Sequence, residues 1–197
     1  MILKPYLLQF LPILSLSLVA GESAVGAVLW SEVSDGDLSG DFTTPKLLTA
    51  SVGENSISGQ IGRTGNLGAT NGSDADYLTL AVPEGLEIVS FTVEAFSVSG
   101  SGSSGGGSFL AYRQGDRFSG QGFGDIESYV LFGVDVFDIL PALGLTTLTE
   151  GEHAFWLQET NPTVVEYSLA IQVVPEPSVA GLLLLGSVSL LGFRRRS

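Results

Sequence analysis

The middle of the chain alternates apolar and polar residues in short runs, and this period of two constrains the fold more than any other feature. Successive side chains of a β-strand point to opposite faces, so such runs predict strands with one buried face. In the clearest run, 76–82, Leu78, Leu80 and Val82 share one face. Clusters of Gly, Asn, Asp and Ser separate this run from the others, which are 46–52, 56–61, 89–98, 109–114, 153–160 and 164–174.

These runs predict an all-β fold of about eight short strands, arranged as a single β-sandwich or jelly roll. The runs 46–52 and 56–61 are predicted to pair as a hairpin, because only Gly53-Glu54-Asn55 lies in the turn between them. The stretch 129–143 is too rich in Val, Phe and Gly for a helix and contains Pro141, so strand and loop are predicted there. The strand 89–95 is predicted to continue to Val98 through a bulge.

Negative charge is concentrated in this middle region. Residues 28–178 hold 20 of the 21 acids but only four of the eight bases, a balance of 4 − 20 = −16 against −13 for the whole chain. Nucleic-acid binding requires clustered Lys and Arg to neutralise phosphates, so we predict no nucleic-acid partner. Thiol catalysis and disulfides are excluded because there is no Cys, and a zinc site is disfavoured by the single His.

The N-terminus has the pattern of a secretory signal peptide. Lys4 precedes the apolar stretch Tyr6–Ala20, and small residues follow. Val25-Gly26-Ala27 fits the cleavage site of signal peptidase best, and Leu18-Val19-Ala20 is the alternative. We therefore expect signal peptidase to remove residues 1–27 during export.

The C-terminus combines a proline-rich break, an apolar segment and an arginine cluster. Two prolines flank Glu176, and such a pair marks a boundary because neither a helix nor a central strand accommodates it. The uncharged segment 179–193 would span about 22 Å as a helix, short of the roughly 30 Å hydrocarbon core. Arg194, Arg195 and Arg196 follow it and favour the cytoplasmic side, which places the acidic body outside.

This tail resembles the PEP-CTERM sorting signal of Gram-negative bacteria over Val174–Ser197. The resemblance implies recognition by exosortase, with Pro175, Glu176 and Pro177 as the processing motif and with the arginines as a membrane-stop cluster. It also implies a precursor anchored in the inner membrane by a transmembrane helix until processing sends the body to the cell surface or the extracellular matrix. Biofilm exopolysaccharide is then the other candidate partner.

The body resembles secreted bacterial pre-peptidase C-terminal modules. The matching segments are Gly36–Ser39, Asp74–Tyr77 leading into Val82–Gly85, and Phe155–Thr160. This resemblance implies a non-catalytic accessory domain. The predicted organisation is therefore a signal peptide at 1–27, a β-sandwich domain at 28–173 and a sorting signal at 174–197.

No catalytic residue and no cofactor are predicted. The tract 100–108 satisfies G-x-G-x-x-G and G-x-S-x-G because it consists almost entirely of Gly and Ser, and it lacks the strand and helix that both motifs need. His153 is the sole histidine and has no nearby serine signal, so we predict a structural role for it in a strand.

Two other functions are kept as alternatives to a non-enzymatic matrix protein. In a carbohydrate-binding module, exposed Tyr112, Phe118 and Phe123 would stack on sugar rings beside Asp116 and Arg113. A hydrolase acting on polysaccharide would need two acids facing each other in a cleft.

Calcium is the alternative to the expectation of no metal. The segment Asp35–Gly40 matches the start of an EF-hand loop, but Lys46 stands where the bidentate Glu belongs, so a true EF-hand is excluded. A looser calcium site using Asp35, Asp37 or the pair Asp74 and Asp76 stays open, because aspartates on turns supply hard oxygen ligands.

Overall fold

The structure is a computed structural model that describes residues 26–62, 74–100, 107–161 and 163–177. The predicted signal peptide before residue 26, the apolar segment 179–193 and Arg194–Arg196 lie outside the described residues. Within the described ranges, no helix is both long enough and apolar enough to cross a membrane.

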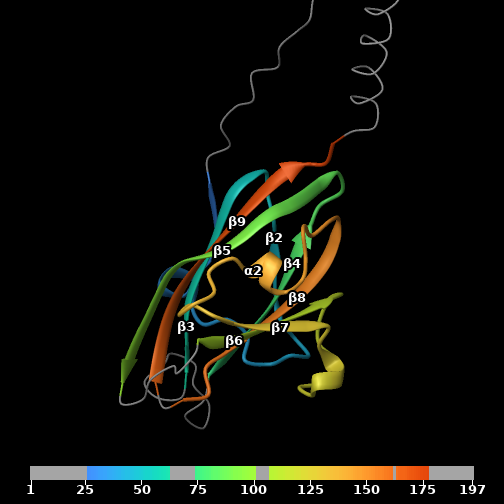
Figure 1. Cartoon of the computed structure of the whole chain (residues 1–197). Coiled ribbons are helices and arrows are strands. Elements are labelled where there is room, and N and C mark those ends of the chain that lie inside the picture. Colours follow the sequence, from blue (N-terminus) through green and yellow to red (C-terminus); the bar gives the residue numbers. More distant parts are fainter. Residues whose placement is uncertain (1–25, 63–73, 101–106, 162, 178–197) are drawn as a thin grey trace, which may run out of the picture.

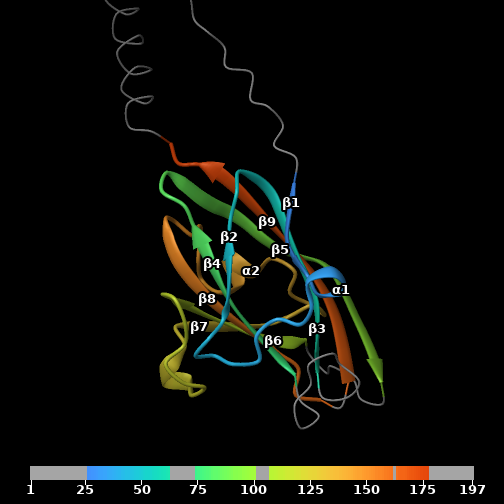
Figure 2. The same ribbon diagram turned by 180° about the vertical axis from the view of Figure 1, so that it is seen from behind.

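The described residues form two mixed β-sheets (Figures 1 and 2). The first sheet has the order β1-β3-β9-β5 and the second has the order β2-β4-β8-β6-β7. The pairs β1–β3 and β2–β4 are parallel, and the other neighbours are antiparallel. The strands are β1 (Ala27–Ser31), β2 (Lys46–Thr49), β3 (Gly53–Gly62), β4 (Ala75–Val82), β5 (Leu86–Gly100), β6 (Ser108–Gln114), β7 (Ser128–Phe132), β8 (Gly151–Gln158) and β9 (Thr163–Pro175).

The two sheets pack face to face around one hydrophobic core. Leu78 and Leu80 of β4 lie in this core, as do alternate residues of β9 from Val165 to Val173. Phe91 of β5 meets Phe155 of β8 edge to face across the interior, with 5.1 Å between the ring centroids. The structure thus confirms the predicted all-β character and the predicted buried face, and it has the layers of a β-sandwich.

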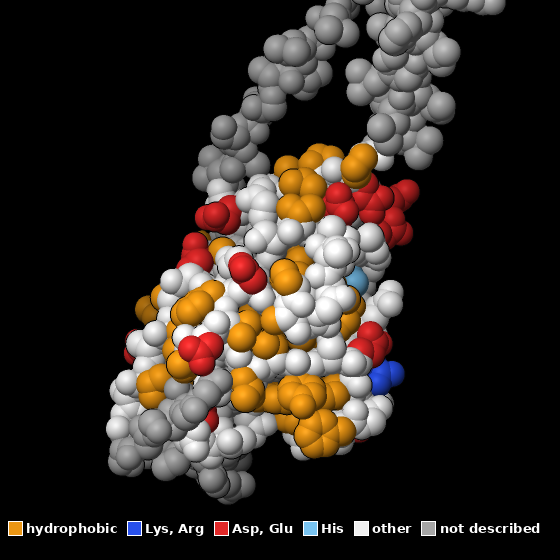
Figure 3. All heavy atoms as spheres, in the orientation of Figure 1, with side chains coloured by type: hydrophobic (Ala, Val, Ile, Leu, Met, Phe, Trp, Pro, Cys, Tyr) orange, Lys and Arg blue, Asp and Glu red, His pale blue; other side chains and the backbone are white. Residues whose placement is uncertain are grey.

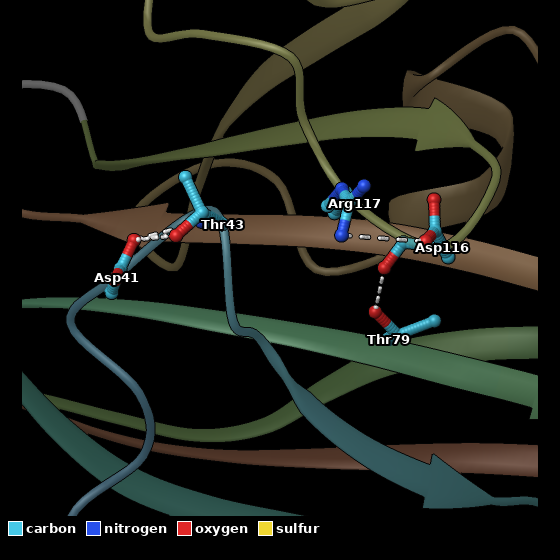
Figure 4. Close-up of polar contacts among 5 residues, drawn as sticks. All are labelled: Asp41, Thr43, Thr79, Asp116 and Arg117. Atoms are coloured by element: carbon cyan, nitrogen blue, oxygen red, sulfur yellow. Dashed lines mark hydrogen bonds and ion pairs between the residues drawn. The ribbon is translucent and has the colours of Figure 1, made fainter.

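A second, smaller cluster lies on the outer face of the second sheet. Tyr77 of β4 stacks on Trp156 of β8, and Phe118 packs against both rings. The hydroxyl of Thr79 donates a hydrogen bond to the backbone carbonyl of Asp116, which holds the segment carrying Phe118 against β4 (Figure 4). This segment continues into the short 3-10 helix η1 (Phe123–Asp125).

The predicted hairpin between 46–52 and 56–61 is wrong. β2 and β3 belong to different sheets, where β2 pairs with β4 and β3 pairs with β9 and β1. The chain crosses between the sheets at Ser51, and the fully buried side chain of Asn55 fixes this crossing. Its Oδ1 accepts from the Ser51 N–H at 3.0 Å and its Nδ2 donates to the Ser51 carbonyl at 2.7 Å.

Other differences from the sequence-based prediction are local. β7 begins one residue before the predicted strand and loop 129–143, and after β7 the chain forms the short helix α2 (Ile139–Ala142) within that stretch. Pro141 is tolerated there because the first-turn N–H groups of a helix have no intrahelical partner. β1 was not predicted and begins at Ala27. The long strand β5 does contain a bulge, but its register shifts lie between Ile88 and Ser90 and between Val93 and Ala95, earlier than the predicted place after Ala95.

Candidate functional site

Three carboxylates from separate parts of the chain meet where the two sheets come together. Glu32 opens the short helix α1 (Glu32–Asp35) directly after β1, and Asp37 follows that helix. Asp76 lies on β4 of the second sheet, two residues before Leu78 and therefore on the same inward face. One oxygen atom from each residue lies within 4.8 Å of the other two, and we call Glu32, Asp37 and Asp76 the carboxylate cluster.

Two residues of the cluster are buried and Asp37 is half-buried, but the cluster is incompletely hydrogen-bonded. Asp76 is fully buried, and Glu32 is only 6% exposed. Asp76 Oδ2 accepts from the hydroxyl of Tyr167, and Glu32 Oε2 accepts from the N–H of Gln60 at 2.7 Å. The oxygens Glu32 Oε1, Asp37 Oδ1 and Asp76 Oδ1 are buried without a hydrogen-bond partner. Buried polar atoms rarely lack partners, so three such atoms in one cluster require a physical explanation.

Burial and mutual repulsion raise the pKa values of all three carboxyl groups of the cluster. The pKa of Glu32 is raised from 4.5 to about 7, and desolvation is the largest cause. The hydrogen bond from the Gln60 N–H lowers this pKa, whereas the charge of Asp37 raises it further. The pKa of Asp76 is raised well above its ordinary value by burial and by the charge of Glu32. Burial also raises the pKa of Asp37. The neighbouring carboxyl of Asp74 disfavours ionisation of both Glu32 and Asp76.

Gly59 on β3 makes room for the cluster. A Cβ atom at this position would lie 2.6 Å from Glu32 Oε1 and 2.7 Å from the hydroxyl oxygen of Tyr167. Both separations are shorter than real Cβ contacts allow, so glycine is needed for this close approach. A surface pocket of about 430 Å³ reaches the same place, and Glu32, Gly59 and Tyr167 are among its lining residues.

The sequence-based calcium alternative named some of these residues. The structure brings Asp37 and Asp76 together and places buried Asp74 next to them. Asp35 is outside the cluster, and its Oδ2 instead accepts from the N–H of Ser31 at 2.9 Å. Glu32 was missed by sequence reasoning, because a lone acid after an unpredicted strand carries no signal of its own.

The prediction that three exposed aromatic residues stack on sugar rings is wrong for two of the three. Tyr112 and Phe118 are buried, in the main core and in the outer cluster respectively. Phe123 on η1 is 79% exposed, and its ring packs edge-on against Tyr129 of β7, which is 53% exposed. Tyr129 also contacts Phe109, and we call Phe109, Phe123 and Tyr129 the aromatic patch. Apolar side chains gather toward this lower end of the molecule in Figure 3.

The polar residues predicted to accompany a sugar site have other contacts. The Arg113 guanidinium donates to the carbonyl of Asp125 at 3.0 Å. Asp116 forms an ion pair with Arg117 at 3.9 Å on the surface (Figure 4). The Asp41–Thr43 hydrogen bond in the same view is a separate contact.

His153 is buried in β8, and both of its ring nitrogens are engaged. Nε2 lies 2.8 Å from the carbonyl of Thr149, and Nδ1 lies 3.2 Å from the hydroxyl of Tyr112. The carbonyl can only accept, so Nε2 carries the proton and Nδ1 accepts from Tyr112. These contacts account for His153 as a structural residue. Most of the glycine-serine tract, 101–106, lies outside the described residues.

The predicted processing motif lies at the end of the last strand. β9 ends at Pro175, and Pro175, Glu176 and Pro177 are all exposed. The N–H of Glu176 donates to the carbonyl of Gly85 at 2.9 Å, which is a single backbone contact to the turn before β5. No protein-family model, curated protein or solved structure matches the chain.

Proposed function

We propose that the chain is an exported, non-enzymatic β-sandwich protein that exosortase processes at Pro175-Glu176-Pro177. The processed body then serves at the cell surface or in the extracellular matrix. The observation that carries this proposal is the exposure of the tripeptide at the end of β9, in front of the apolar and arginine-rich segments of the sequence.

The position of the tripeptide is compatible with cleavage of the folded protein. β9 lies between β3 and β5 in the first sheet and ends at the first residue of the tripeptide, Pro175, which pairs with Leu86. A protease that cuts beyond Pro175 therefore acts on exposed residues and leaves the strands of both sheets intact. β1 begins and β9 ends at the same end of the sandwich (Figures 1 and 2), which suits a body held at a membrane from one side.

Expression of the full chain in a Gram-negative host with exosortase, and in a strain without it, tests the proposal. We expect loss of the C-terminal segment only in the first strain, measured as the mass of the mature C-terminus. Replacement of Glu176 by Ala should leave the precursor in the membrane fraction. Glu150→Ala is the matched control, because it removes another exposed glutamate, outside both the tripeptide and the Gly85 turn that the tripeptide contacts. Equal masses in both strains would contradict the proposal.

Carbohydrate binding is a second candidate for the body. The observation that favours it is the aromatic patch, in which Phe123 and Tyr129 expose ring surface at an edge of the second sheet. Exposed aromatic rings bury large apolar area on contact with a ligand and fix its orientation. Tyr112 and Phe118 have no part in this version of the site.

The carboxylate cluster does not favour a polysaccharide hydrolase. Glycosidases hold two carboxyl groups about 5 Å or more apart on either side of a substrate bond. Asp76 is fully buried between the sheets and bonded to Tyr167, so a sugar cannot reach it without opening the core.

A further inference from the structure

We propose that Glu32, Asp37 and Asp76 bind one divalent cation, and that the ion is Ca²⁺. No such ion is needed for the sorting of the chain, so this inference is independent of the proposed function. It is based on the spacing of the three carboxylates, on their unpartnered buried oxygens and on the chemistry of the donors.

The spacing fits a single ion. Ca²⁺ binds oxygen at about 2.3–2.6 Å, so two oxygens on the same ion lie at most about 5.2 Å apart. The three cluster oxygens lie within 4.8 Å of one another. One ion can therefore contact Glu32, Asp37 and Asp76 together with small side-chain movements.

The unpartnered oxygens point to a missing positive partner. Among the described residues, five buried side-chain polar atoms lack a hydrogen-bond partner, and three of them are carboxylate oxygens, one from each cluster residue. Two of those residues are more than nine-tenths buried: Asp76 is fully buried and Glu32 is 6% exposed. Leaving a buried acceptor unsatisfied destabilises the fold, more so for a charged group, so a ligand that satisfies all three oxygens would stabilise it.

The second oxygens of the two buried ligands are already fixed. The hydroxyl of Tyr167 holds Asp76 Oδ2, and the N–H of Gln60 holds Glu32 Oε2. Such outer hydrogen bonds orient metal ligands and leave the other oxygen for the ion. Ca²⁺ would thereby connect α1, which directly follows strand β1 of the first sheet, to β4 of the second sheet.

The bases of the described chain are occupied elsewhere. Lys46 Nζ lies 4.3 Å from the ring centroid of Trp30, Arg113 bonds the 119–125 segment, and Arg117 pairs with Asp116. Among the described residues, therefore, no base pairs with the cluster, and a cation from solution would supply the positive charge that they do not. The pocket lined by Glu32, Gly59 and Tyr167 provides its entry path.

The donor set selects Ca²⁺. All three ligands are carboxylates, which are hard oxygen donors, and neither histidine nor cysteine contributes, so zinc and copper are disfavoured. Mg²⁺ usually keeps several of its waters, whereas Ca²⁺ accepts a larger and more flexible oxygen shell. A largely buried cluster of three closely spaced carboxylates, with Asp37 half-buried, therefore favours Ca²⁺.

The test uses the full-length chain in mild detergent after treatment with a chelator. We expect calorimetric titration with CaCl2 to give one bound ion per chain and thermal unfolding to shift to higher temperature. MgCl2 at the same concentration should give a smaller shift. Asp76→Asn and Glu32→Gln should each weaken Ca²⁺ binding by more than about tenfold, because each removes a charged ligand. Asp35→Asn is the matched control, since Asp35 lies on the same helix but outside the cluster.

The result on the unaltered protein decides the question even where a variant fails to fold. If saturating CaCl2 leaves both the heat of titration and the unfolding temperature unchanged, the cluster binds only protons and the proposal is wrong. Equal weakening by Asp35→Asn would likewise overturn it, because binding would then depend on overall negative charge. In chelator, Asp76→Asn should be at least as stable as the unaltered chain, since it removes a buried and repelled carboxyl.

Discussion

The hydroxyl of Tyr167 donates a hydrogen bond to Oδ2 of Asp76, and this contact joins the two sheets through the interior. Tyr167 belongs to β9 of the first sheet and Asp76 to β4 of the second. Both side chains are buried, and burial raises the pKa of Tyr167 well above its ordinary value. The tyrosine therefore stays protonated and acts only as a donor to the carboxyl.

Replacement of Tyr167 by Phe should lower the free energy of unfolding by about 1–3 kcal/mol, because it leaves a second oxygen of Asp76 buried without a donor. Urea unfolding of the chelated protein measures this loss. Tyr129→Phe is the matched control, since it removes the hydroxyl of a tyrosine that is 53% exposed. Equal effects of the two substitutions would argue against a special role for the contact.

Without a divalent cation, stability should fall as the pH rises from about 4.5 to about 7. The pKa of Glu32 is about 7 in the fold and 4.5 as its ordinary value, so the folded state binds the proton more tightly. As the pH rises, Glu32 ionises first in the unfolded state, at about pH 4.5. The stabilisation that comes from the tighter proton binding of the folded state is therefore lost progressively up to about pH 7. Asp37, Asp74, Asp76 and Tyr167 face Glu32: the charges of Asp37 and Asp74 oppose its ionisation, and its own charge opposes the ionisation of Asp76 and Tyr167.

Urea unfolding at several pH values in chelator, compared between the unaltered chain and Glu32→Gln, isolates this contribution. The variant should show a flatter dependence between pH 4.5 and 7. Added CaCl2 should stabilise the unaltered chain increasingly over the same range, because ligands bind metal in their ionised form. Identical pH profiles for the two chains would show that Glu32 titrates normally.

The sequence predicts the strands of this fold better than their partners. Alternation in 76–82 and 164–174 identifies β4 and β9 and their buried faces, because burial on one face directly determines residue type. The pairing of β2 with β4 could not be predicted in the same way. It depends on the side chain of Asn55 bonding the backbone of Ser51 at the crossing between sheets.

Only part of the candidate site could be predicted from the sequence. Asp37 and Asp76 attract attention because each stands in an Asp-rich turn motif, and the structure places both in the cluster. Glu32 joins them only because α1 and β1 pack beside β3, a long-range contact that no local pattern reports. Tyr167 has the residue type of an ordinary core position, so its bond to Asp76 is equally hidden.

Replacement of Gly59 by Ala should destabilise the protein by about 1–3 kcal/mol and weaken Ca²⁺ binding together, because the added methyl overlaps Glu32 Oε1 and the Tyr167 hydroxyl. Thermal unfolding with and without CaCl2 measures both effects. Gly124→Ala is the matched control, since a Cβ there meets no atom within 4 Å. If CaCl2 raised the unfolding temperature of Gly59→Ala as much as that of the unaltered chain, the ion would have to bind away from Glu32 Oε1 and the Tyr167 hydroxyl.

Replacement of Phe123 by Ala should abolish glycan binding by the full-length chain if the aromatic patch is a carbohydrate site. Phe123 is the most exposed ring of the patch, and its removal leaves the core untouched, so the free energy of unfolding should change by less than about 0.5 kcal/mol. A glycan array compares this variant with the unaltered chain. Val33→Ala is the control for loss of exposed apolar surface, because Val33 is 97% exposed and lies on α1, outside the patch. Binding that survives Phe123→Ala, or that falls equally with Val33→Ala, would exclude the patch as the sugar platform, since stacking requires the ring itself.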